Sequence, residues 1–422
     1  MGVGLASSGK VIVSHPTGNA NVTAVVNALY EHDLLAAFYT CLVWRADRAL
    51  ARFTPRRIRA LLERRSRVQL PAELVRMRPA RELVRSLMVH TRRTHLIDNE
   101  DNPFSIESIY SDLDAYVGRR LKRFPGLSAV YAYEDGAIHH FERARAMGIR
   151  CIYDLPIGYW RVNRQIQLEE AELQPGWKGT LGALEDSDAK LARKDREIAL
   201  ADVIFVASSY TRKTLESYPG WKSDTAKPVV VIPYGTPEPV AQERTLTDRS
   251  EPLRVLYVGS LSQRKGIAYL AAAMYLVGGA ARLTVIGRKY GRSEELDRFC
   301  AEHRWIESLP HGQVLEEMSR HDVLVFPSLF EGFGLVLGEA LSRGVPVITT
   351  PHTGGPDLVR EAIDGFIVPI RDGEAIASRL MQLHDDRELL KRMSDAARER
   401  AGQMSWQAYQ DKTAAAVRQY LS

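Results

Sequence analysis

Two glutamates with seven residues between them, Glu331 and Glu339, stand in the stretch of the chain that is richest in chemistry. An apolar run at 323–326 precedes them and another at 344–350 follows, which predicts a glycine-containing loop and a helix between two strands. Glu331 is expected in the loop, and Glu339 about two turns into the helix. Sugar hydroxyls need carboxylate acceptors and a diphosphate needs unpaired amides, so this pattern favours a sugar-nucleotide site.

A basic loop, Gly259–Gly266, lies between a predicted strand and a predicted helix. Its Arg264 can bind a diphosphate as a planar fork, and Lys265 can bind one as a point charge. Adjacent basic residues before a helix are often only exposed, so this loop alone does not establish a phosphate site. The loop and the two glutamates together make the phosphate interpretation the favoured one.

The elements that must position these residues alternate between short apolar strands and helices. A chain of 422 residues is too long for one compact core, and two domains of about 200 residues each are expected. Strand, glycine turn and helix in repeated order are typical of a doubly wound α/β sheet covered on both faces. We expect strands at 10–14, 34–40, 129–133, 151–154, 203–207, 229–232, 254–258, 282–286, 323–326, 345–349 and 365–368.

The domain organisation follows from a change in composition. Residues 237–252 are rich in Pro, Glu, Arg and Thr and poor in apolar residues, which is typical of a connection. We therefore predict an N-terminal Rossmann-like domain over 1–238, a C-terminal one over 239–404, and a terminal helix over 405–422 that crosses back to the first domain.

The composition excludes several classes of protein. The three cysteines are scattered and form no zinc-binding spacing, which favours a reduced, cytoplasmic setting. The longest apolar run, 269–281, is shorter than the roughly 18 residues a membrane span needs, and the first residues lack the order of a signal peptide.

The positive charge is concentrated in one segment. Residues 45–93 hold fifteen arginines against four acids, in a pattern that reads as amphipathic helix, while the whole chain carries a net charge of only +5. A solvated helical face is one interpretation, and docking on the anionic inner face of a membrane is the other. Nucleic acid is not expected, because the segment has few aromatic residues for base stacking and no recognisable module.

The two chemical segments resemble the signature of family 4 of the retaining glycosyltransferases. The resemblance rests on Val258-Gly259, Arg264-Lys265-Gly266, Pro327-Ser328, Glu331-Gly332-Phe333-Gly334, Glu339-Ala340 and Gly344-Val-Pro-Val. It is dense over residues 254–370 and looser over the rest. It implies the GT-B architecture, in which two Rossmann-like domains face one another across a cleft.

The resemblance also implies roles for these residues. Glu331 would bind hydroxyls of the donor sugar, and Glu339 would accept both ribose hydroxyls. Arg264 and Lys265 would hold the diphosphate and stabilise the charge that grows on the departing nucleotide. Further donor contacts are expected from the base-binding loop 309–312 and at backbone or glycine positions: Gly18, Gly259, Gly312, Phe333, Gly334 and Leu335.

One residue of the family pattern is missing. Many members have a histidine after the strand that corresponds to residues 129–133, whereas this chain continues with Glu134, Asp135 and Gly136. Tyr133, Glu134 or Asp135 could take its role, and Asp135, just before Gly136, is the better candidate for orienting the acceptor. His139 and His140 are expected to be surface or packing residues.

The resemblance implies substitution on one face of the sugar, in which the leaving phosphate takes the proton of the acceptor. No protein nucleophile is then needed, and the chain shows no serine elbow or Cys–His pairing. Asp112-Leu-Asp114 spells the metal-binding pair of another glycosyltransferase architecture, but it lies in a helix-like run where a solvated face is expected. We predict no metal and no cofactor besides the donor substrate.

The function expected is transfer of a hexose from a UDP- or GDP-linked sugar to a saccharide or lipid-linked acceptor, with retention, in the synthesis of a cell-surface polysaccharide or glycoconjugate. One alternative is a protein that binds a sugar nucleotide without turning it over. A sugar-nucleotide epimerase of the same architecture is another. A glycogen-type phosphorylase would need a cofactor lysine in a context that the chain lacks.

Overall fold

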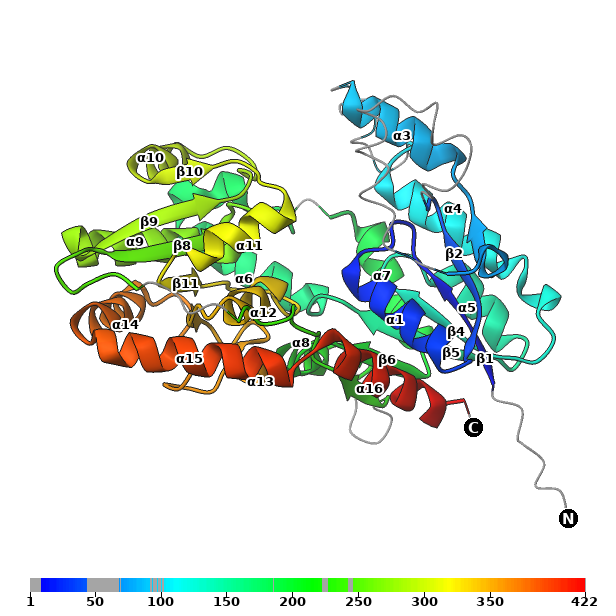
Figure 1. Cartoon of the computed structure of the whole chain (residues 1–422). Helices are drawn as coiled ribbons and strands as arrows, with labels where there is room; N and C mark the ends of the chain where they lie inside the picture. Colours follow the sequence, from blue (N-terminus) through cyan, green and yellow to red (C-terminus); the bar gives the residue numbers. More distant parts are fainter. Residues whose placement is uncertain are drawn as a thin grey trace, which may run out of the picture.

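The computed structural model describes residues 9–43, 68, 70–91, 93, 97, 100, 102–184, 186–221, 227–241 and 246–421. These residues form two parallel β-sheets with helices packed against them, side by side in Figure 1. About half of the predicted basic segment, including 45–67, lies outside the described residues.

The first sheet has seven strands in the order β3-β2-β1-β4-β5-β6-β7. Their bounds are β1 (Lys10–Ser14), β2 (Leu35–Thr40), β3 (Val75–Met77), β4 (Leu127–Tyr133), β5 (Arg150–Leu155), β6 (Val203–Val206) and β7 (Val229–Val231). Its helices are α1 (Ala20–Glu31), α3 (Ala80–His90), α4 (Ile106–Gly118), α5 (Ile138–Arg145), α6 (Trp160–Leu173), α7 (Asp188–Leu200) and α8 (Ser209–Thr214).

The second sheet has six strands in the order β10-β9-β8-β11-β12-β13. Their bounds are β8 (Leu253–Val258), β9 (Ala281–Ile286), β10 (Arg304–Ile306), β11 (Val323–Phe326), β12 (Val347–Thr349) and β13 (Gly365–Ile367). Its helices are α9 (Ile267–Val277), α10 (Glu294–Glu302), α11 (His311–Ser319), α12 (Leu335–Ser342), α13 (Gly355–Leu358), α14 (Gly373–Asp385) and α15 (Arg387–Gln403), and α16 (Trp406–Gln419) ends the chain.

The order of strands reverses once in each sheet, between β1 and β4 and between β8 and β11. Loops that follow neighbouring strands leave the sheet in opposite directions at such a point, which opens a crevice at the carboxyl ends of the strands. The loop with Gly18 follows β1, the loop with Arg264 follows β8, and the loop with Glu331 follows β11. All three loops therefore lie at the two places where the strand order reverses.

The central strands are buried on both faces, which explains why they read as short apolar runs. In β4 the residues from Ala129 to Ala132 have no exposed surface, and the same holds for Val323 to Val325 in β11. The predicted strands are therefore present, with ends that differ by one or two residues. Two edge strands, β3 and β10, were not predicted, because each has only three residues and is partly exposed.

Three further expectations need correction. Part of the basic segment that reads as helix is the strand β3. The helix α12 begins at Leu335, so Glu339 is its fifth residue and lies about one turn in, not two. Asp114 is in a helix as expected but not on a solvated face: it is 4% exposed, and its carboxylate accepts the backbone N–H groups of His139 and His140.

The two halves are joined by segments that cross between them. The terminal helix α16 returns to the first domain and packs against α1, as expected (Figure 1). Tyr234 is stacked on Trp406 at the start of α16, and the rings of Tyr234 and Phe333 meet edge to face.

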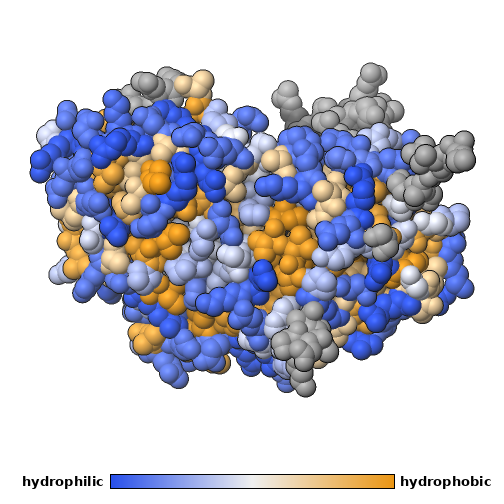
Figure 2. All heavy atoms as spheres, turned by 90° about the horizontal axis from the view of Figure 1, so that it is seen from below, coloured by the Kyte–Doolittle hydropathy of each residue, from blue (hydrophilic) through white to orange (hydrophobic). Residues whose placement is uncertain are grey.

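The face in Figure 2 is mostly hydrophilic near its rim, and hydrophobic residues gather near its middle. Within the described residues, no helix is long and apolar enough to span a membrane.

Candidate functional site

A hollow of about 330 Å³ lies at the carboxyl ends of β8 and β11 and takes residues from both halves of the chain. The second half contributes the ends of these strands and the start of α12. The first half contributes Asn21, Pro156 and Tyr234. The lining residues are Asn21, Pro156, Tyr234, Val258, Gly259, Lys265, Phe326, Glu331, Phe333, Gly334, Leu335 and Val336.

Glycines hold the basic loop against the glutamate loop. Gly266 has a φ of 74°, and a Cβ there would lie 2.1 Å from the carbonyl oxygen of Pro327. The backbone N–H of Leu329 donates to the carbonyl of Arg264 at 3.0 Å. Two segments about 65 residues apart are thereby held in one fixed arrangement.

The cations of the basic loop meet Glu331 at the floor of the hollow. The ammonium of Lys265 contacts Oε2 of Glu331, and the Arg264 guanidinium lies 3.7 Å from the same oxygen. Arg264 also donates to the carbonyl oxygen of Phe330 at 2.7 Å. Burial, and then the neighbouring Arg264, hold the pKa of Lys265 well below its usual value. One buried and one partly buried basic side chain face a single carboxylate here, so the place favours an added anion.

The start of α12 adds unpaired amides to this positive region. Its N-cap, Gly334, has a φ of 86°, and no described side chain caps the helix. A Cβ at Gly334 would lie 2.9 Å from the ring of Phe326, so glycine is needed there. Leu335 and Val336, which carry the first N–H groups of the helix, line the hollow. These N–H groups have no acceptor within the helix and can bind an anion there.

Glu339 contacts the loop that was predicted to hold the base. Its Oε1 lies 2.8 Å from Nε2 of His311, the first residue of α11. Gly312 follows directly, and no described atom lies within 4 Å of where its Cβ would be. The structure thus brings the predicted ribose carboxylate and the predicted base loop together. His311 lies inside that predicted loop, but no role was predicted for its side chain.

His15 is a second residue that sequence reasoning missed. It directly follows β1, is 7% exposed, and packs edge-on against Tyr133. Burial lowers its pKa to about 4, so the ring is neutral at pH 7. Its Nδ1 accepts the backbone N–H groups of Thr17 and Gly18, both at 3.1 Å, and so fixes the turn in which Gly18 has a φ of 60°. The available signal was a polar residue at a strand end just before a glycine turn.

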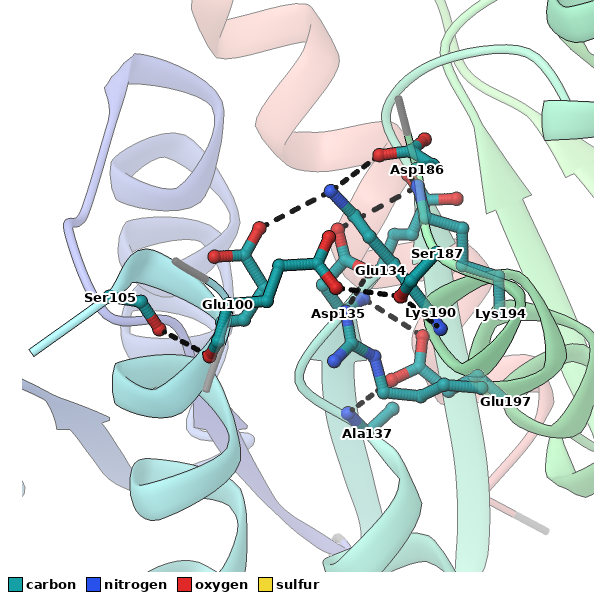
Figure 3. A network of polar contacts seen from close by, with 12 residues as sticks. Glu100, Ser105, Glu134, Asp135, Ala137, Asp186, Ser187, Lys190, Lys194 and Glu197 are labelled. Atoms are coloured by element: carbon teal, nitrogen blue, oxygen red, sulfur yellow. Dashed lines mark hydrogen bonds and ion pairs between the residues drawn. The ribbon is translucent and has the colours of Figure 1, made fainter. Parts of the chain in front are cut away.

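Asp135 lies elsewhere, in a network of charges against α7 (Figure 3). Its carboxylate is 2.8 Å from Arg193 and 3.7 Å from Lys194, and these cations hold its pKa below the usual value although burial raises it. Glu197 accepts the backbone N–H of Asp135 at 2.8 Å, and burial raises the pKa of Glu197 to about 8. The residues that line the hollow do not include Asp135, and its role at the acceptor stays a prediction.

A second hollow, of about 220 Å³, adjoins the first through the basic loop. Ser260 and Arg264 line the second hollow, while their neighbours Gly259 and Lys265 line the first. The remaining lining residues are mostly polar: Asn163, Gln167, Thr180, Gly182, Ala183, Asp186, Ser262 and Tyr290. Among the described residues, no group of three or more His, Cys, Asp or Glu side chains could hold a metal ion.

Comparisons with known proteins agree with this arrangement. Residues 241–400 match the model of the family "Glycosyl transferases group 1". The amylovoran biosynthesis glycosyltransferase AmsK of Erwinia amylovora is 29% identical over 149 residues, which are 32% of this chain and 36% of AmsK. The chain spans about a quarter to two fifths of the length of the curated relatives it matches.

Solved structures share the fold over nearly the whole chain. Sucrose-phosphate synthase from Thermosynechococcus elongatus superposes with a TM-score of 0.66 at 18% identity, over 97% of this chain and 98% of that one. HepE from Anabaena, in complex with UDP, superposes with a TM-score of 0.61 at 14% identity, over 97% and 99% of the two chains. The expected fold, two Rossmann-like domains in the GT-B arrangement, is confirmed.

Proposed function

We propose that this protein is a glycosyltransferase that moves a sugar from a nucleotide-diphosphate sugar to an acceptor bound on the side of the first domain. The observation that carries the proposal is the floor of the first hollow, where the buried Lys265 and the partly buried Arg264 face one carboxylate beside the uncapped start of α12. A diphosphate would satisfy both the cations and the amides.

The donor would lie along the second sheet. Its diphosphate would contact Arg264 and Lys265. Glu331 would then bind hydroxyls of the sugar in place of Lys265. The ribose would reach Glu339 beside His311. The two cations would stabilise the charge that develops on the departing phosphate, which lowers the barrier to transfer. We further propose the retaining, metal-independent mechanism of family 4, in which the leaving phosphate accepts the proton of the acceptor.

UDP- and GDP-linked hexoses are the donors we propose. The HepE structure that shares this fold contains UDP, and AmsK is named for the biosynthesis of amylovoran, which supports a role in polysaccharide or glycoconjugate synthesis. We place the acceptor, a saccharide or a lipid-linked saccharide, at the second hollow. Amide and carboxylate groups such as those of Asn163 and Asp186 suit its hydroxyls.

Contact with an anionic membrane surface at the cytoplasmic face is part of this proposal. In α3 the side chains of Leu83 and Leu87 are 47% and 63% exposed, and Arg81 and Arg85 lie on the same helix. Apolar side chains flanked by arginines are typical of a helix that lies on anionic lipid. Flotation with vesicles that contain phosphatidylserine at low salt should recover the protein. Leu87→Ser should reduce the recovered fraction, and Tyr275→Ser, an exposed residue of the other domain, should not.

A panel of UDP- and GDP-hexoses tests the proposed activity against the sensor alternative. A transferase without its acceptor slowly passes the sugar to water, so it releases nucleotide, and chelation of metals should leave that rate unchanged. A sensor binds the donor and releases no nucleotide. An epimerase would return an altered sugar nucleotide, which chromatography of the recovered donor detects.

A further inference from the structure

One segment of the first domain, Trp160–Thr180, packs on the second domain, and we call it the strap. It comprises α6 and a short 3-10 helix, Pro175–Thr180, and in Figure 1 α6 lies beside the second sheet. The backbone N–H of Arg292 donates to the carbonyl of Gly179 at 3.1 Å. A Cβ at Gly179 would lie 2.1 Å from the carbonyl oxygen of Arg292, so the contact is close enough to require glycine.

A buried carboxylate, Glu170, joins the strap to the basic loop. Glu170 has no exposed surface. Its oxygens accept from Nε2 of Gln263 at 2.6 Å, from the hydroxyl of Tyr269 at 3.0 Å and from Nε of Arg371 at 2.5 Å. All three donors come from the second domain, and a buried carboxylate that lost one of them would be costly.

The contacts of Gln263 also limit the movement of the two basic residues, because Gln263 directly precedes Arg264 and Lys265. Its side-chain oxygen accepts the backbone N–H of Ala268 at 3.0 Å, which fixes the start of α9. Its backbone N–H donates to Oγ1 of Thr180 at 2.9 Å, so the strap holds this residue at two points. The residue is itself fully buried.

We infer that Glu170 is a positioning residue for the diphosphate: it holds Gln263, and through it the place of Arg264 and Lys265. The inference rests on the proposed function, since it assigns the diphosphate to that loop. A residue of the first domain would thereby set the geometry of a site on the second. The two cations are useful only when they point at the same group, so a small shift of the loop weakens the diphosphate contact without removing any charge.

The test compares Glu170→Gln with Glu169→Gln. Glu169 is the neighbouring residue and also binds Arg371, at 2.7 Å, but its side chain is 40% exposed and no hydrogen bond joins it to Gln263. Titration calorimetry gives the dissociation constants of UMP, UDP, GMP and GDP for both variants and the unchanged protein. The ratio of monophosphate to diphosphate constants isolates the terminal phosphate from the rest of the nucleotide.

We expect Glu170→Gln to reduce this ratio about tenfold and Glu169→Gln to preserve it. An unchanged ratio in Glu170→Gln would overturn the inference. If both dissociation constants rose equally, the residue would have a role in folding alone. Amide hydrogen exchange over 263–268 is the second reading, and it should speed up in Glu170→Gln only. Slow exchange there overturns the inference even when nucleotides bind. Failure of the unchanged protein to bind any of the four contradicts the proposed function itself.

Discussion

At the scale of residues, the proposed donor site depends on charges that are incompletely balanced before a ligand arrives. Lys265 is buried and Arg264 is partly buried, and Glu331 is the one carboxylate that contacts the pair among the described residues. Burial opposes the charge of Lys265, as its lowered pKa shows. A diphosphate would supply the missing negative charge, so the affinity for it should depend strongly on the lysine.

Replacing Lys265 tests this dependence. Lys265→Ala should weaken the binding of free UDP or GDP by about ten- to a hundredfold, because one charge-assisted contact is lost. Titration calorimetry measures the change. Lys391→Ala, on the exposed face of α15, is the matched control, and an equal effect in both variants would refute the role of Lys265.

A pH dependence of stability should arise from Asp154. This carboxyl is 3% exposed and accepts the hydroxyl of Tyr131 at 2.6 Å, and burial raises its pKa to about 7. Because the folded pKa lies above the unfolded one, the protonated group favours folding below about pH 4, and this contribution is lost as the pH rises through 7.

Thermal denaturation between pH 5 and pH 8.5 can detect this loss. Asp154→Asn, which stays neutral, should remove most of the fall in stability between pH 5 and pH 7, about 3 kcal/mol, and should change little above pH 8. Asp186→Asn, in a partly exposed side chain, is the comparison. An equally steep fall in Asp154→Asn would show that the carboxyl is not the source.

Some site residues could be read from the sequence and others could not. Glu331, Glu339, Arg264 and Lys265 stand in a local pattern, so their neighbourhood could be predicted. The hollow is also lined by Asn21, Pro156 and Tyr234 from the other half of the chain, and Glu170 from that half binds Gln263 beside the basic loop. Contacts between residues so far apart in the sequence leave no local pattern.

At the scale of elements, short apolar runs with glycine turns were sufficient to predict the central strands, because both faces of these strands are buried. The edge strands β3 and β10 escaped prediction, since one side of each faces solvent and their composition is mixed. The length of α12 before Glu339 was overestimated, because the φ of 86° at Gly334 sets the start of the helix at Leu335.

The terminal helix α16 should stabilise the junction between the halves. Tyr409 is 4% exposed, and its ring lies 5.5 Å from that of Tyr234 and 5.7 Å from that of Trp406. Tyr409→Ala should therefore lower the free energy of unfolding by about 3 kcal/mol, seen as a lower midpoint in urea. Tyr275→Ala, at a side chain that is 88% exposed, should have almost no effect. Equal midpoints for the two variants would contradict this packing.

At the scale of the whole molecule, the two halves touch at the glutamate loop itself. The carbonyl of Gly332 accepts the hydroxyls of Ser208 and Thr211 from the first domain. A Cβ at Gly332 would lie 1.9 Å from the carbonyl oxygen of Pro156. The approach of the domains is thus fixed by backbone contact beside Glu331, which a sequence pattern cannot reveal beyond the presence of a glycine.

Gly332→Ala should hold the two halves apart and lower turnover more than it weakens nucleotide binding, since most of the proposed donor contacts lie on the second domain. Kinetics on a donor that the protein hydrolyses, together with calorimetry, separate the two effects. Gly279→Ala, with no described atom within 4 Å of the added Cβ, is the control. Unchanged turnover in Gly332→Ala would show that this contact is not needed.

The most direct test of the account is the release of nucleotide from UDP- and GDP-hexoses by the unchanged protein and by Glu331→Gln. The account predicts slow release from at least one donor, and a rate at least about a hundredfold lower in the variant at an unchanged melting temperature. No release from any donor, or equal rates in the two proteins, would contradict it.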